Sequence, residues 1–135
     1  MRLTIVAALG LCGLAGCESA LSPSGSLAGK WGWELNGNPS GSYVTLTLES
    51  AGSVVSGTGG VCGIGPDCVP GAVTVAGSAV PGLGRFDLTI TGGGGFVATY
   101  AGSVVGTDQL RGTWTQGSQS NPSRVLNRCT PSSVC

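Results

Sequence analysis

The chain has 135 residues, enough for one domain with a single modest hydrophobic core. Its six basic residues balance its six acidic residues, so it lacks the clearly basic face that nucleic-acid binding requires. The 26 glycines follow no Gly-X-Y period and separate short runs rich in Val, Thr and Leu, which we interpret as strands joined by turns and not as a disordered tract.

The apolar run at residues 3–14 predicts an export signal, because it is shorter than the roughly 20 residues that a membrane-spanning helix needs. It ends in Leu14-Ala15-Gly16-Cys17, which resembles the lipobox of bacterial lipoproteins. The resemblance implies that residues 1–16 are a signal peptide and that Cys17, the new N-terminus, receives a diacylglyceryl group. An ordinary secretory signal with a coincidental cysteine is the alternative.

A lipid-modified Cys17 would anchor the domain to a membrane without spanning it, because each acyl CH₂ buried in the bilayer contributes about 0.8 kcal/mol. Cys12 fits the lipobox poorly, since the bulky Leu11 stands where a small residue is required. Residues 17–28 are rich in Ser and predict a flexible tether of about 30 Å. Glu18 is not the aspartate associated with inner-membrane retention of lipoproteins, so we expect a bacterial cell-envelope protein on the outer membrane.

Four further cysteines follow the tether: Cys62, Cys68, Cys129 and Cys135. An even number in an exported chain predicts disulfide bonds. The equal spacing of the two segments favours the pairs Cys62–Cys68 and Cys129–Cys135, and two other pairings remain open. A metal site is the alternative, but structural zinc uses closer cysteine pairs or histidine, and the chain has no histidine. We therefore expect neither a metal nor a cofactor.

Period-two alternation, broken by Gly, Ser, Asn and Pro, predicts strands through the rest of the chain. The expected strands are residues 30–35, 43–48, 53–58, 72–80, 85–90, 96–105, 109–116 and 123–128. In several of these runs apolar side chains fall on one face, as do Phe86, Leu88 and Ile90 in residues 85–90. No segment shows a sustained helical period. Because an open sheet of about eight antiparallel strands would expose its edges, we expect residues 29–135 to form one small up-and-down barrel.

The segment Leu27–Trp31, with the sequence LAGKW, is similar to the Gly-x-Trp start of the calycin barrels, the lipocalins and avidins. That resemblance implies a barrel in which Trp31 plugs one end. Residues 112–114 repeat the Gly-x-Trp spacing, and the chain length suits an avidin-sized barrel. Trp33 stands where avidins carry a polar ligand residue, so the resemblance gives no support to biotin binding.

The sequence offers no catalytic residues. Without histidine there is no Ser-His-Asp or Cys-His arrangement. Glu34 and Asp87 are expected to point to solvent, and a glycosidase-like pair drawn from these residues and Asp108 is the alternative. The arginines are dispersed and are expected on solvated faces: Arg85, Arg111, Arg124 and Arg128.

Four aromatic residues are candidates for ligand binding: Trp31, Trp33, Tyr100 and Trp114. One interpretation is that they converge on one end of the barrel, which with eight strands is just wide enough for one small ligand. The other, that they form core and plug, is the favoured one. The functional hypothesis is a non-catalytic binding module for a small apolar or aromatic ligand or for a protein partner. The alternative is a protein-interaction lipoprotein, either a periplasmic enzyme inhibitor acting through loop residues such as Asp67 or a structural envelope component.

Overall fold

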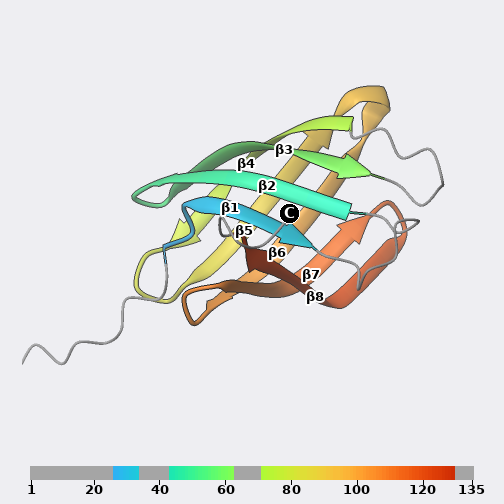
Figure 1. Cartoon of the computed structure of the whole chain (residues 1–135). Coiled ribbons are helices and arrows are strands. Elements are labelled where there is room, and N and C mark those ends of the chain that lie inside the picture. The colour runs from blue at the N-terminus through green and yellow to red at the C-terminus, as the bar shows by residue number, and fades with distance from the viewer. Residues whose placement is uncertain (1–25, 34–42, 63–70, 130–135) are drawn as a thin grey trace, which may run out of the picture.

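The computed structural model describes residues 26–33, 43–62 and 71–129. They form eight antiparallel strands that follow one another in chain order and close into a barrel (Figure 1). The strands are β1 (Gly29–Trp33), β2 (Tyr43–Ala51), β3 (Val54–Cys62), β4 (Gly71–Val80), β5 (Arg85–Gly92), β6 (Val97–Val105), β7 (Gln109–Gln116) and β8 (Gln119–Arg128). The predicted all-β up-and-down barrel is confirmed.

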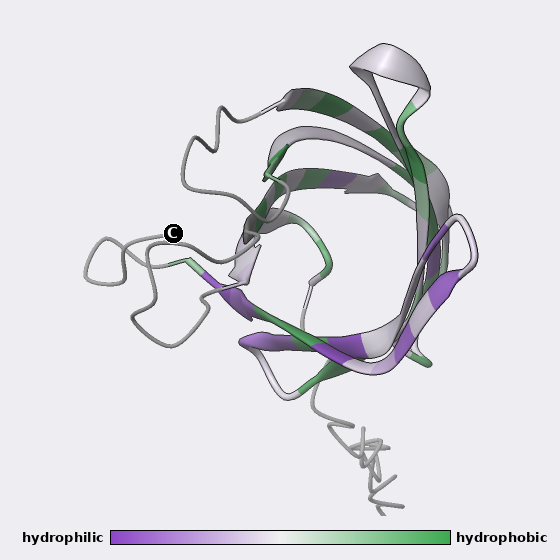
Figure 2. Cartoon of the chain, turned by 90° about the vertical axis from the view of Figure 1, so that its right-hand side faces the viewer, coloured by the Kyte–Doolittle hydropathy of each residue, from purple (hydrophilic) through white to green (hydrophobic). Residues whose placement is uncertain are grey.

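Closure of the barrel depends on the pairing of β1 with β8, where Trp31 lies opposite Arg128. Figure 2, which looks along the barrel from the end at which β1 finishes, shows the strands as a closed ring. One short 3-10 turn, Gly93–Gly95, leads from β5 towards β6. No helix in the described part of the chain is both long enough and apolar enough to cross a membrane.

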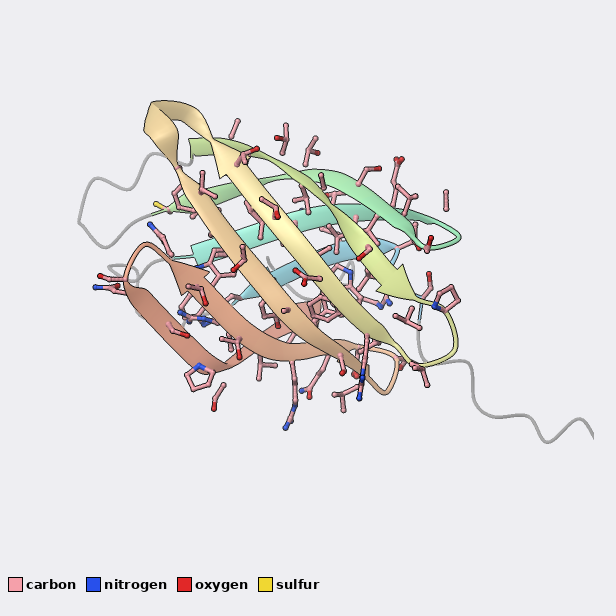
Figure 3. The ribbon with its side chains drawn as sticks, turned by 180° about the vertical axis from the view of Figure 1, so that it is seen from behind. Atoms are coloured by element: carbon pink, nitrogen blue, oxygen red, sulfur yellow. The ribbon has the colours of Figure 1, made fainter. Side chains whose placement is uncertain are left out.

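Alternation of side chains across each strand places the core inside the ring. In β5, Phe86, Leu88 and Ile90 are buried, while the residues between them are exposed. Figure 3 shows side chains extending from the outer surface of the strands seen from behind. The outward chains are mostly small and polar, as in the hydroxyl pair of Thr74 and Thr91, whose oxygens are 2.9 Å apart between β4 and β5. The shared face expected for Phe86, Leu88 and Ile90 is confirmed.

The two ends of the barrel differ. At one end lie the start of β1, the end of β8 and the turns after β2, β4 and β6. We call this the closed end. At the other, β1, β3, β5 and β7 finish and β2, β4, β6 and β8 begin. We call this the open end, and the arrowhead of β1 points to it in Figure 1.

Trp31 fills the closed end. Its side chain is completely buried, and its indole N–H donates a hydrogen bond of 2.8 Å to the carbonyl oxygen of Leu27. The guanidinium carbon of Arg128 lies 4.1 Å from the centroid of the Trp31 ring. The Arg128 guanidinium donates to three backbone carbonyls, those of Thr107 (2.7 Å), Ala28 (2.8 Å) and Ser26 (2.6 Å). Arg128 thereby ties the entry of the chain to the turn after β6.

The strand β8 begins earlier than predicted, at Gln119, and contains an irregularity. Gly112 of β7 lies opposite Arg124, but Trp114 lies opposite Asn121, so β8 holds one extra residue between these pairs. Pro122 falls in this stretch, where its missing N–H costs no ladder hydrogen bond. The N–H of Ser123 donates instead to the side-chain oxygen of Asn121, at 3.1 Å. The predicted start at residue 123 is therefore wrong, because Pro122 lies in a bulge within the strand and does not mark where the strand starts.

Candidate functional site

A cavity of about 830 Å³ lies at the open end of the barrel. Its lining comes from every strand except β6, together with Gly93 and Phe96 between β5 and β6. Small-molecule sites in proteins commonly have volumes of 300–1,000 Å³. The cavity is therefore large enough to enclose one small organic molecule.

The cavity has an apolar wall and a polar lip. The wall includes Trp33, Val44, Val73, Phe96 and Trp114. The lip is formed where β7 passes into β8, and its side chains are those of Gln116, Gln119, Ser120 and Asn121. All four lip residues are exposed. A molecule with an apolar body and a polar end matches this division.

The closed half of the barrel is filled. Leu46, Leu88 and Tyr100 are completely buried. The ring of Tyr100 lies 5.1 Å from that of Phe86 and 5.9 Å from that of Trp114, measured between centroids. Both contacts are tilted, an arrangement that aromatic pairs prefer. The interior is thus a packed core beneath a cavity.

Tyr100 is buried in the core and also contacts Trp114, which lines the cavity. Its hydroxyl lies 2.9 Å from the carbonyl oxygen of Leu110 and 3.1 Å from that of Arg124, and hydrogen-bonds to both. Burial raises the pKa of Tyr100 above its ordinary value, against smaller lowering effects from the Arg124 charge and the Leu126 backbone. The hydroxyl therefore stays protonated and holds the backbone of β8 at the position of Arg124.

Arg124 lies inside the barrel, so its expected position on a solvated face is wrong. The reason is the alternation of β8, in which Leu126 is completely buried and Arg124, two residues earlier, points the same way. Its guanidinium lies over the ring of Trp33. Burial lowers the pKa of the Arg124 guanidinium, and the nearby Tyr100 opposes this shift. Arg128 also faces inward, which corrects the same expectation at the closed end.

The four predicted aromatic candidates do not gather at one end. Trp33 and Trp114 line the cavity, whereas Trp31 and Tyr100 are not among its lining residues. Trp31 and Trp33 share one face of β1, as predicted, but two residues advance a strand by about 6.6 Å. That advance separates the plug at the closed end from the wall of the cavity.

The cysteines that can be placed lie at different levels of the barrel. Cys62 ends β3 at the cavity, opposite Tyr43 of β2, and the N–H of Cys129 bonds to the carbonyl oxygen of Lys30, which lies opposite Thr47. Four residues along β2 correspond to about 13 Å. A disulfide requires Cα atoms within about 7 Å, so Cys62 and Cys129 do not pair with each other. The favoured pairs stay a prediction, since Cys68 and Cys135, like Cys17, lie outside the described residues.

The carboxylates that can be placed are remote from the cavity. Asp87 is exposed on the outer face of β5, and Asp108 is exposed in the turn after β6. Glu34 and Asp67 lie outside the described residues. Within residues 26–33, 43–62 and 71–129, no group of three or more Cys, Asp or Glu side chains is arranged to hold a metal ion.

The described site offers a hollow with an aromatic and apolar wall, one cationic group and a lip of amides and hydroxyls. Such a surface can bind and orient a molecule through apolar contact and hydrogen bonds.

Comparison of the chain with protein-family models, curated proteins and solved structures finds no match.

Proposed function

We propose that this chain is a lipid-anchored, non-catalytic binding module of the bacterial cell envelope that holds a small apolar or aromatic ligand at the open end of its barrel. The observation that carries the proposal is the cavity of about 830 Å³ walled by Trp33 and Trp114. Binding sites for small molecules are typically concave and apolar, with a few polar groups that fix orientation.

The path of the chain favours an anchored arrangement. The carbonyls of Ser26 and Leu27 are hydrogen-bonded to Arg128 and Trp31 at the closed end, so the chain enters the barrel there. Residues 18–25 separate Ser26 from Cys17, a reach of about 30 Å when extended. An anchor on Cys17 would therefore join the domain at the end opposite the cavity, leaving the cavity accessible.

The proposal is tested by titrating the soluble chain from residue 18 onward with N-phenyl-1-naphthylamine, a neutral apolar probe that fluoresces when shielded from water. We expect saturable binding with one site per chain. Trp33→Ala and Trp114→Ala should each weaken binding about tenfold, because each removes an aromatic wall of the cavity.

Val97→Ala serves as the matched control. Val97 is 53% exposed near the open end of β6 and does not line the cavity. Its truncation should leave the affinity within about twofold, since it removes no wall of the cavity. Absence of saturable binding, or equal losses from all three variants, would refute a ligand site at the open end.

A further inference from the structure

We propose that the ligand carries a single carboxylate on its apolar body, and that Arg124 binds this group inside the cavity. This inference rests on the proposed function, since it names the chemistry of the molecule held at the same site. Two Trp–Arg pairs lie inside the barrel, and they differ in a way that points to such a ligand.

The two pairs are alike in their residue types and differ in their hydrogen bonds. In each, an inward-facing arginine of β8 lies over a tryptophan of β1: Arg128 over Trp31 and Arg124 over Trp33. The Arg128 guanidinium donates to three backbone carbonyls. The Nε of Arg124 is buried and, within the described part of the chain, has no hydrogen-bond partner. The donors of Arg128 are thus used in hydrogen bonds within the fold, whereas the Nε–H of Arg124 is not.

Stacking leaves the donors of Arg124 available. A guanidinium carries its five N–H groups in one plane, so contact of its face with an indole ring uses none of them. A buried donor without a partner is unfavourable, because it has lost its hydrogen bonds to water. An acceptor that enters the cavity and pairs with Arg124 would remove this cost, and a planar carboxylate can accept two parallel N–H bonds from a guanidinium.

The charge of the cavity favours an anion over a neutral acceptor. Arg124 is the only charged side chain among the lining residues that the structure describes. Its burial disfavours the charged form, as the lowered pKa indicates. An opposite charge in contact with the guanidinium would compensate for this desolvation. The apolar wall, with Val44, Val73 and Phe96, would then take the uncharged part of the same molecule.

The test uses displacement of N-phenyl-1-naphthylamine by decanoate and by 1-decanol, which share an apolar chain and differ in charge. The wild-type chain should bind decanoate at least about tenfold more tightly than 1-decanol, because a charge-assisted bidentate pair is stronger than a neutral hydrogen bond. In Arg124→Gln the two competitors should become equal within about twofold.

Two further variants make the result specific. Arg124→Lys keeps the charge but loses the planar fork, so it should show an intermediate preference for decanoate. Arg111→Gln removes a charge from the exposed outer face of β7 and should keep the full preference. If Arg124→Gln is poorly folded, Arg124→Lys against Arg111→Gln decides the question.

The outcomes separate the two proposals. If the neutral probe binds but the wild-type chain shows no preference for decanoate, the anionic ligand is refuted and the cavity as a ligand site stands. Retention of the preference in Arg124→Gln would also refute the role of Arg124. If the neutral probe does not bind at all, the proposed function itself fails.

Discussion

At the scale of single residues, Tyr100 has the clearest consequence for stability. Its ring packs between Phe86 and Trp114, and its hydroxyl hydrogen-bonds to the carbonyls of Leu110 and Arg124. Deep burial makes ionisation of this hydroxyl unfavourable, which is why its pKa is raised. One side chain therefore links the packing of the core to the backbone that positions the only charged group of the described cavity lining.

The raised pKa of Tyr100 predicts a loss of stability at high pH. Above about pH 10 the unfolded chain releases the phenolic proton while the folded chain retains it. The unfolded state then binds fewer protons, so the free energy of unfolding falls as pH rises, by up to about 1.4 kcal/mol per pH unit from this group. Urea unfolding at several pH values between 7 and 11 measures the slope.

Tyr100→Phe isolates the contribution of the hydroxyl. At neutral pH the variant should be less stable by about 1–2 kcal/mol, because two backbone carbonyls lose a donor. Its stability should then decline less steeply above pH 10 than that of the wild-type chain, since the phenyl ring does not titrate. Equal slopes for the two proteins would contradict the assignment of the alkaline loss to Tyr100.

At the scale of elements, β6 and β7 approach each other closely on the inner side of the barrel. Gly102 and Gly112 lie opposite each other in the register. A Cβ atom at Gly112 would collide with the carbonyl oxygen of Ala101 and would lie 2.8 Å from the Cα of Gly102. The side chains of two ordinary residues would not fit here, so these glycines permit the local contact between the strands.

Gly112→Ala should therefore destabilise the barrel by about 1–3 kcal/mol, the usual cost of forcing extra atoms into packed structure. Gly93→Ala is the matched control, because a Cβ there meets no atom within 4 Å. Both substitutions restrict the unfolded chain equally, so their difference reports on the folded state. Chemical unfolding should show Gly93→Ala within about 0.5 kcal/mol of wild type. A similar loss in both variants would argue against the close approach at Gly112.

The strand β8 shows what the sequence could and could not predict. Period-two alternation was sufficient to place Leu110 and Trp114 of β7 on one inner face, and both are buried. The same rule applied to β8 places Arg124 on the face of Leu126. A solvated position was nevertheless predicted for Arg124, because arginine side chains are mostly exposed in proteins. The alternation was the better guide, because a stacking partner on β1 lets a long cationic side chain lie inside. That partner is set by barrel closure, which no local pattern contains.

At the scale of the whole molecule, the two ends of the barrel differ. The closed end is sealed by Trp31 and Arg128, and the chain enters there; the open end holds the cavity. Composition and alternation could predict the strands and the closure of the sheet. They could not predict which aromatics meet, because that depends on how far each strand advances along the barrel. For this reason Trp31 fills the closed end, whereas Trp33 lines the cavity at the open end.

If Cys17 carries the predicted lipid anchor, the tether would join the barrel at its closed end, and the cavity would face away from the membrane. Intact-mass spectrometry of the protein from its native membrane should give a chain that starts at Cys17 and carries diacylglyceryl and acyl groups. Reduction should add a pair of hydrogens for each disulfide, consistent with the four remaining cysteines. Cys17→Ser should abolish the lipid mass, whereas Cys12→Ser, a change within the predicted signal peptide, should leave the mature mass unchanged. An unlipidated wild-type chain would remove the membrane from the proposal and return Cys17 to the cysteines that can form disulfides. The ligand site proposed for the cavity would not be affected by that result.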